Sequence, residues 1–197
     1  MRKIAFVDID TQFDFMKKKG GLYVKEAERI IPNLKKLTGF ANKHKIIIIA
    51  SVDAHSVRDP EFKMFPAHCV KGRPGQRKIK ETLIKNHIFI NSQKRSQGNL
   101  QSLLDRFRQI ILEKKTFAVF SNPNTENLLK NIDTAFVYGV ATDYCVKTAC
   151  LGLLKLNKKV FIVGDAIKAI SDKEGKRILK ALVKKGAKLI KTKTLIN

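Results

Sequence analysis

Short runs of apolar residues alternate with helical patterns along this chain, and that alternation constrains its fold more than any other feature. The run from 46 to 49 is four consecutive isoleucines, apolar on both faces, as expected of a central strand covered by helices. Such an alternation predicts βα units and a parallel sheet. The predicted strands are Ile4–Ile9, Ile46–Ser51, Gln109–Glu113, Thr134–Tyr138, Val160–Val163 and Ala187–Ile190.

One long stretch, from residue 53 to about 107, interrupts this regular pattern. It is rich in lysine and only weakly periodic, with short strand or helix pieces expected at Ile88–Ile90 and Leu100–Phe107. Long irregular connections in compact proteins usually serve as binding or lid segments. Because 197 residues suffice for one hydrophobic core, we expect a single domain over 1–197 with a lid segment at about 53–107.

The chain is strongly basic, with 40 Lys and Arg against 17 Asp and Glu and a net charge of +23. A polyanion partner would explain the charge, but the lysines are spread evenly and aromatic residues are not interleaved with them. We therefore expect no specific nucleic-acid partner. Asp8 and Asp10 interrupt the first apolar run, and no later stretch approaches a membrane span. Three cysteines without paired spacing fit a reducing compartment, so we expect a cytoplasmic protein.

Four reactive side chains follow four of the predicted strands. Asp10 ends the first strand, Asp53 follows the second, Lys114 the third and Cys145 the fourth. The carboxyl ends of parallel strands meet at one edge of the sheet, where such folds bind ligands. Taken singly, each could be an ordinary turn, surface or buried residue. Four different chemical types at one edge predict a reactive site.

Cys145 stands at the start of a helical pattern, where the helix dipole is expected to lower the pKa of a thiol. A thiolate can attack a carbonyl while a carboxylate such as Asp10 moves protons. A cation such as Lys114 can stabilise negative charge, and N–H groups at the helix start can form an oxyanion hole. These residue types therefore suit covalent hydrolysis.

Asp53-x-His55, with His68 thirteen residues later, is a spacing typical of metal ligands. One carboxylate and two imidazoles suit zinc, iron or manganese and leave positions open for water or substrate. The alternative is that His55 is an ordinary loop residue and His68 a capped polar group. Two of only four histidines fall here beside a carboxylate, which favours a metal site.

Together these motifs resemble the isochorismatase-like cysteine hydrolases. The segment 10–15 (DTQFDF) is similar to their Asp-x-Gln-x-Asp-Phe signature, and 139–146 (GVATDYCV) is similar to their nucleophile segment. Lys114, followed by Phe117 and Phe120, resembles the catalytic-lysine stretch. Residues 65–70 (FPAHCV), with Asp53 and His55, resemble the metal site of nicotinamidases in particular.

The resemblance implies a three-layer α/β/α sandwich on a six-stranded parallel sheet, and a nicotinamidase-like activity that serves NAD salvage. Nicotinamide would place its ring nitrogen on the metal and its ring between Phe15 and Phe65, beside Val140 and Ala141, which a cis peptide would join. The N–H groups of Ala141 and Cys145 would form the oxyanion hole. Asp10 would relay protons, ammonia would leave from a thioester, and water would release nicotinate.

The chain also departs from the family pattern. Glu61 stands where some nicotinamidases have a further histidine ligand, Phe65 stands where many relatives have tryptophan, and Asp8 occupies a strand position that is usually apolar. A second interpretation is a cysteine hydrolase of another small amide, such as pyrazinamide or a ureido or carbamoyl compound. A third, more distant one is a non-catalytic protein that binds polyanions. The resemblance also implies self-association into a homo-oligomer.

Overall fold

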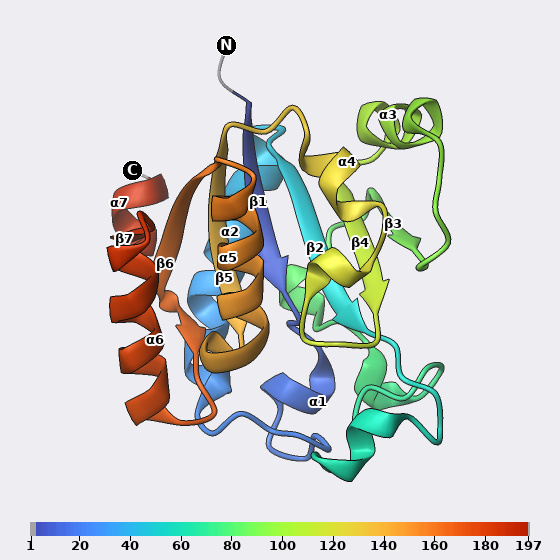
Figure 1. Cartoon of the computed structure of the whole chain (residues 1–197), viewed down its shortest axis with the longest axis vertical. Coiled ribbons are helices and arrows are strands. Elements are labelled where there is room, and N and C mark those ends of the chain that lie inside the picture. The colour runs from blue at the N-terminus through green and yellow to red at the C-terminus, as the bar shows by residue number, and fades with distance from the viewer. Residues whose placement is uncertain (1–2, 197) are drawn as a thin grey trace.

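The computed structural model describes residues 3–196 and is built on one parallel sheet (Figure 1). Its strand order is β3-β4-β2-β1-β5-β6-β7. The strands are β1 (Ile4–Ile9), β2 (Ile47–Asp53), β3 (His87–Ile90), β4 (Gln109–Lys114), β5 (Thr134–Val140), β6 (Lys159–Lys168) and β7 (Lys188–Ile190). The prediction of six strands is wrong by one. The short piece expected at 88–90 joins the main sheet at its edge, where only Ile90 of its four residues is fully buried, so its apolar signal is weak.

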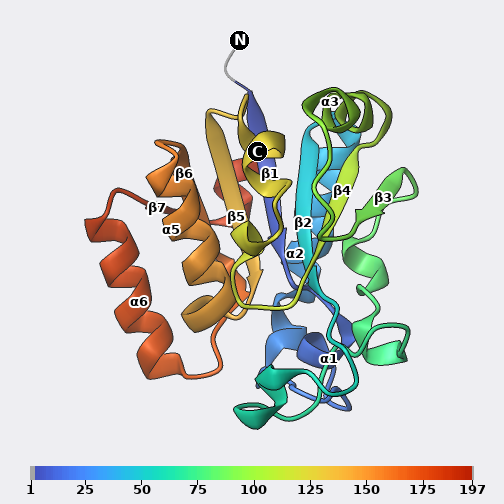
Figure 2. The same ribbon diagram turned by 45° about the vertical axis from the view of Figure 1, so that its right-hand side comes forward.

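Helices cover both faces of the sheet, which confirms the three-layer α/β/α arrangement. In Figures 1 and 2, α2 lies on one face and α5 and α6 on the other, and α7 packs beside α2. The helices are α1 (Phe13–Met16), α2 (Ile31–Lys43), α3 (Gln97–Arg106), α4 (Thr125–Leu129), α5 (Lys147–Lys155), α6 (Asp172–Lys184) and α7 (Thr192–Ile196). Within residues 3–196, none of these helices has the length and apolar character needed to cross a membrane.

The central strands carry the core, as their apolar sequences predict. Ile48 and Ile49 point to opposite faces of β2 and both are buried, since each face of the sheet is covered. The helix ends also follow from sequence. Ser171 caps α6 by accepting a hydrogen bond from the Glu174 N–H.

The strand order changes direction between β1 and β5, so a crevice for ligands is expected there, at the carboxyl edge. Close approach of these two strands depends on Gly139, which pairs with Ile9 and has a φ of 114°. A Cβ at this position would lie 2.0 Å from the Ile9 carbonyl oxygen. Glycine therefore sets how closely the segment that follows β5 can lie to the end of β1.

The irregular segment after β2 gathers at this same edge of the sheet, at the lower right of Figure 1. It contains short 3₁₀ turns at Pro60–Lys63, Pro74–Gln76 and Lys80–Thr82 before it enters β3. Isolated bridges join His55 to Val70 and Gln12 to Lys78. The segment is thus tied both to itself and to the end of β1.

Candidate active site

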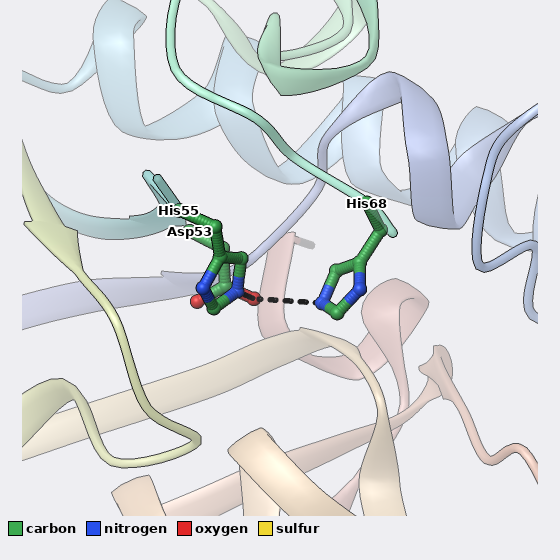
Figure 3. Close-up of side chains that lie close together, drawn as sticks. All are labelled: Asp53, His55 and His68. Atoms are coloured by element: carbon green, nitrogen blue, oxygen red, sulfur yellow. Dashed lines mark ion pairs between the residues drawn. The ribbon is translucent and has the colours of Figure 1, made fainter. Parts of the chain in front are cut away.

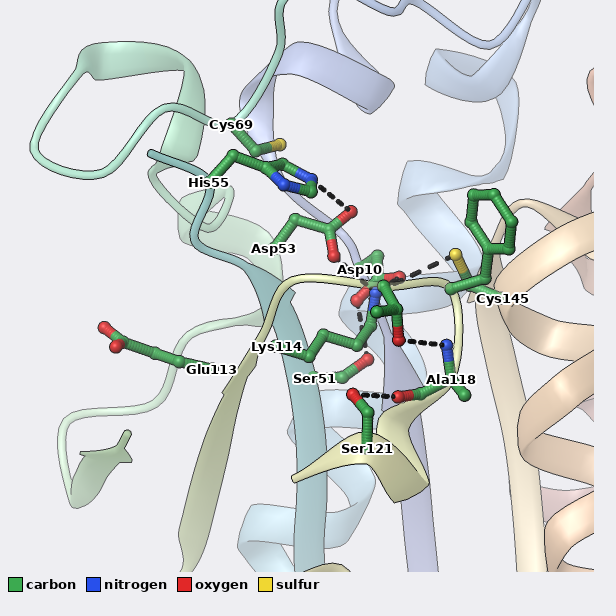
Figure 4. Close-up of polar contacts among 12 residues, drawn as sticks. Asp10, Ser51, Asp53, His55, Cys69, Glu113, Lys114, Ala118, Ser121 and Cys145 are labelled. Atoms are coloured by element: carbon green, nitrogen blue, oxygen red, sulfur yellow. Dashed lines mark hydrogen bonds and ion pairs between the residues drawn. The ribbon is translucent and has the colours of Figure 1, made fainter. Parts of the chain in front are cut away.

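Asp10, Asp53 and Lys114 form a buried charged cluster at the carboxyl edge of the sheet (Figure 4). Asp53 and Lys114 are the last residues of β2 and β4, and they are direct partners in the register of these strands. The Lys114 Nζ lies 2.5 Å from Asp53 Oδ1 and 2.8 Å from Asp10 Oδ2. One ammonium group therefore bridges two carboxylates from neighbouring strands.

Cys145 joins this cluster from the far side of the crevice. A π-helical turn, Thr142–Val146, follows β5 and runs directly into α5, and Cys145 lies within that turn. Its Sγ lies 3.8 Å from the Lys114 Nζ. The structure thus brings together all four reactive residues predicted from the strand ends.

Burial governs the proton affinities of this cluster. It raises the pKa of the Cys145 thiol well above its usual range, and the charge of Lys114 only partly opposes that rise. The expectation of a lowered thiol pKa is therefore wrong for the protein without metal, because desolvation and two nearby carboxylates outweigh the helix start. Burial also raises the pKa of Asp10, although Lys114 opposes this.

Lys114 behaves in the opposite way. Burial alone would lower the pKa of its ammonium group, but the charges of Asp10 and Asp53 raise that pKa well above its usual range. For Asp53, burial is outweighed by Lys114, which holds the pKa of the carboxyl below its usual value. The cluster therefore favours the charged forms of Lys114 and Asp53 and the protonated forms of Asp10 and Cys145.

Asp53, His55 and His68 meet as a second cluster that shares Asp53 with the first (Figure 3). One potential ligand atom from each lies within 4.8 Å of the others. His68 donates its Nδ1–H to the Pro66 carbonyl at 2.8 Å, which leaves Nε2 with a free lone pair. Burial lowers the pKa of His68 and so favours the neutral ring that binds metals.

Both ring nitrogens of His55 are buried, and neither makes a hydrogen bond of good geometry, although carboxylate oxygens lie 3.3 Å from Nδ1 and 3.8 Å from Nε2. Buried polar atoms without partners are unfavourable, and a cation bound to the ring would satisfy one of them. Glu61 extends the set, since its Oε1 lies 3.7 Å from His68 Nε2 and 4.0 Å from His55 Nε2. These residues therefore fit a divalent metal ion with mixed nitrogen and oxygen ligands.

Asp59, which was not predicted from the sequence, lies next to the candidate metal ligands. Its Oδ2 is 3.3 Å from His55 Nδ1, so it is placed to orient this ring from the side away from the other ligands. Its spacing of four residues from His55 was the available signal. The same residue accepts a hydrogen bond from the Glu61 N–H and so begins the 3₁₀ turn that carries Glu61.

Three further polar residues hold the site in place, and the sequence analysis gave them no role. The Gln12 side-chain amide accepts from Asp53 N–H at 2.7 Å and donates to Asp53 C=O at 2.9 Å. Asp14 accepts from the N–H of Cys69, the residue after His68, at 2.7 Å. Ser51 donates its hydroxyl to Asp10 Oδ1 at 2.6 Å. Gln12 and Asp14 belong to the signature at 10–15, and Ser51 precedes Asp53 by two positions, so it points to the same face of β2.

A small cavity opens between the thiol and the metal cluster, and most of its lining is apolar or aromatic. Of the predicted substrate contacts, Phe15, Phe65 and Ala141 line it, whereas Val140 is fully buried and does not. The peptide between Val140 and Ala141 is cis, as expected. The lining residues are Phe15, Leu22, Asp53, Glu61, Phe65, His68, Phe117, Ala141, Tyr144, Cys145 and Ile170.

Aromatic side chains pack edge to face over the nucleophile. The ring centroids of Phe65 lie 5.9 Å from Phe117 and 5.6 Å from Tyr144, and those of Phe117 and Tyr144 are 5.4 Å apart. Phe117 and Tyr144 were not predicted as lining residues, although both lie within three positions of Lys114 or Cys145. A flat ring that entered this cavity would contact aromatic faces and edges on several sides.

Comparison with known proteins identifies the family of this chain. The Isochorismatase domain matches residues 4–194. The chain is 24% identical over 201 residues to a nicotinamidase from Saccharomyces cerevisiae, with 85% of this chain and 89% of that protein covered. A pyrazinamidase/nicotinamidase structure from Streptococcus mutans has a TM-score of 0.79 at 25% identity, covering 95% of this chain and 100% of that one. A Pyrococcus horikoshii pyrazinamidase in complex with zinc has a TM-score of 0.80 at 23% identity, covering 96% and 99%. The chain belongs to the isochorismatase family.

Proposed function

We propose that this protein is a metal-containing cysteine amidohydrolase whose substrate is nicotinamide, which it converts to nicotinate and ammonia. Its similarity to nicotinamidases makes it a hydrolase of amide C–N bonds. The observation that carries the proposal is the meeting of Cys145, Asp10 and Lys114 in one buried cluster that shares Asp53 with a metal-ligand set.

In the proposed reaction, the Cys145 sulfur attacks the amide carbon while Asp10 accepts the thiol proton. The raised pKa of Asp10 suits a base that must hold this proton briefly. The N–H groups of Ala141 and Cys145 would stabilise the oxyanion, and Lys114 would hold Asp10 in place. Asp10 then returns the proton to the leaving nitrogen, ammonia departs, and a thioester remains.

The second half of the reaction reverses these proton movements. Asp10 takes a proton from water as the water oxygen attacks the thioester carbon. The C–S bond breaks, and the proton returns to sulfur, so that Cys145 is again a thiol and the acid is released. All atoms balance without an oxidant, a reductant or a third substrate.

The cavity supports a neutral, flat substrate rather than an anionic one. Among its lining residues there is no lysine or arginine, and the nearby Lys114 is already bound to two carboxylates. An anionic ureido or carbamoyl acid would therefore find no basic side chain among these lining residues, and Asp53 and Glu61 would compete with it for the charge of a bound cation. A bound divalent ion, held by Asp53, His55 and His68 with Glu61 as a fourth ligand, would supply a Lewis-acidic partner for a ring nitrogen.

Further parts of the proposal concern the protein as a whole. We assign zinc as the metal, because a zinc complex is known for the structurally similar Pyrococcus horikoshii pyrazinamidase. We also propose a single domain in which the segment at about 53–107, which supplies Glu61, Phe65 and His68, acts as the lid. A homo-oligomer in the cytoplasm, working in NAD salvage, completes the proposal.

Ammonia release from nicotinamide tests the function directly. Cys145→Ala should lower kcat/KM by about 10⁵-fold because no other thiol lines the cavity. Cys150→Ala is the matched control, since Cys150 is buried within α5 away from the cavity and should retain activity. Normal turnover by the Cys145 variant would refute the mechanism. Pyrazinamide and a carbamoyl acid, assayed in parallel, separate nicotinamidase activity from hydrolysis of other small amides.

A further inference from the structure

A second buried ion pair lies on β1, just before the active site. Asp8 Oδ2 is 2.7 Å from Lys78 Nζ, and neither side chain is exposed to solvent. Asp8 precedes Asp10 by two residues, while Lys78 comes from the irregular segment after β2. Neither residue lines the cavity, and the proposed chemistry uses neither.

Thr11 connects the two charges. Its hydroxyl donates to Asp8 Oδ1 at 2.9 Å and accepts from Lys78 Nζ at 2.5 Å. The Thr82 hydroxyl lies 2.7 Å from the same oxygen. Because the single Thr11 proton goes to the carboxylate, Thr82 donates in that contact, and the Ile79 carbonyl oxygen at 3.3 Å is an alternative acceptor for the same Thr82 proton. The Thr11 oxygen thus uses its one proton and both of its lone pairs, which fixes its position.

The backbone on either side of this network is also tied to the end of β1. Ile79 N–H donates to Thr11 C=O at 2.9 Å, and Phe13 N–H donates to Arg77 C=O at 2.8 Å. Gln12 lies between these two bonds and donates its side-chain amide to Gln76 C=O at 2.8 Å. The segment 76–82 is therefore fastened to residues 11–13.

Within residues 8–13, Asp10 and Gln12 are the two residues that contact the active-site groups. Asp10 has a φ of 49° and carries the carboxylate that binds Lys114. Gln12 holds both backbone groups of Asp53. A displacement of Thr11 would shift the residues on both sides of it, and through them the base, the ammonium group and a metal ligand.

We propose that the Asp8–Lys78 pair, acting through Thr11, is a positioning device that holds Asp10 and Gln12 in their working places. Asp8, Thr11 and Lys78 are positioning residues, because none of them contacts the thiol or the cavity. The inference rests on the proposed function for its kinetic readout and on the proposed metal site for its zinc readout, whereas the thermal midpoint depends on neither.

Stability alone does not account for this pair. A buried ion pair loses its hydration, and apolar side chains of similar volume often stabilise a fold equally well or better. What apolar side chains cannot do is bind the Thr11 hydroxyl. The pair therefore fixes the position of Thr11 and, with it, the orientation of its neighbours Asp10 and Gln12. Apolar packing would not do this.

The test compares Lys78→Met, Asp8→Val, the double variant, Thr11→Val and Thr11→Ser. Three quantities are measured: the thermal midpoint, kcat and KM for nicotinamide, and zinc affinity in competition with a chelator. Lys78→Met should lower kcat by about tenfold with little change in KM, and it should weaken zinc binding. The double variant should regain the wild-type midpoint but not the wild-type kcat or zinc affinity.

The Thr11 variants keep the test decisive if a charge variant fails to fold. Thr11→Val removes the hydroxyl without changing charge or shape, and kcat should fall, whereas Thr11→Ser retains the hydroxyl and should behave like wild type. Lys71→Met is the matched control, because Lys71 lies in the same segment and its side chain is 61% exposed in its ion pair with Glu113, which is 16% exposed. It should stay within about twofold of wild type in every measurement.

Two results would overturn the proposal. The first is a double variant that regains kcat and zinc affinity along with its midpoint, which would show a role in stability only. The second is a folded Thr11→Val variant with wild-type kcat and zinc affinity. If the wild-type protein fails to hydrolyse nicotinamide, the proposed function falls, but zinc affinity across the same variants still decides whether the pair positions Asp53.

Discussion

Lys78 and Lys114 are both buried, and each pairs with an aspartate at or near the end of β1, yet their surroundings differ. Lys78 binds one carboxylate, Asp8, so this pair is formally neutral and closed. Lys114 binds two carboxylates and lies beside a thiol and a cavity. Counted formally with Glu61 included, three carboxylates and one ammonium leave two negative charges in excess, which one divalent cation would balance; burial and the neighbouring Asp53 raise the pKa of Glu61 in this arrangement. We conclude that a buried cluster with an excess of one sign of charge, rather than a buried ion pair as such, indicates reactive chemistry.

The largest expected difference between the two lysines is in catalysis. Lys114→Met should lower kcat/KM for nicotinamide by about 10³-fold, because the variant loses the cation that holds Asp10 and Asp53 beside the thiol. Lys78→Met should lower it by only about tenfold, since Lys78 acts through Thr11. Steady-state ammonia release measures both. Equal losses in the two variants would break the distinction between a catalytic and a positioning lysine.

The free energy of unfolding provides the next contrast. Lys78→Met or Asp8→Val alone should lose about 3–5 kcal/mol, because each leaves a buried charge without its partner. The double variant should recover most of that loss, since no charge then remains buried there. Urea unfolding at neutral pH measures all three. If the two losses of unfolding free energy add in the double variant, Asp8 and Lys78 are not a neutral pair in which each charge is balanced by the other.

Zinc should stabilise the protein by binding to the cluster that shares Asp53 with Lys114. At a free zinc concentration 100 times its Kd, the wild-type protein should gain about 2.7 kcal/mol of stability. His55→Ala should lose most of this gain because His55 belongs to the ligand cluster. His87→Ala, in the edge strand β3, should retain it. The shift in thermal midpoint with added zinc distinguishes these cases, and an unchanged shift in the His55 variant would remove this residue from the metal site.

The smallest effect is expected for an exposed ion pair in the same part of the molecule. Lys71→Met breaks a contact with Glu113 in which the lysine is 61% exposed. Exposed pairs contribute less than about 1 kcal/mol, so the free energy of unfolding should change by about 0.5 kcal/mol or less. A loss as large as that of Lys78→Met would mean that burial is not what separates the pairs.

The sequence was sufficient to predict the parallel sheet and the residues that end its strands. Periodicity located the strands, and parallel order then predicted that Asp10, Asp53, Lys114 and Cys145 would meet. Local patterns do not report desolvation, so the raised pKa of the Cys145 thiol was not predicted. They also do not report which residues of an irregular segment touch a strand. The partner of Asp8 depends on tertiary structure alone, whereas the four-residue spacing of Asp59 from His55 was a local signal for their contact.

The register of β2 against β4 has a consequence for how this protein can vary. Asp53 and Lys114 face each other as direct partners, so a metal ligand and the shared ammonium group derive their separation from strand alignment. Because side chains alternate along a strand, inserting or deleting one residue in either strand would turn one of these groups to the opposite face. Length changes in the two strands are therefore tolerable only when they occur together, whereas the loops that precede the two strands carry no site residue and can lengthen. In active members of the family, insertions and deletions should therefore occur in those loops and not in one of the two strands alone.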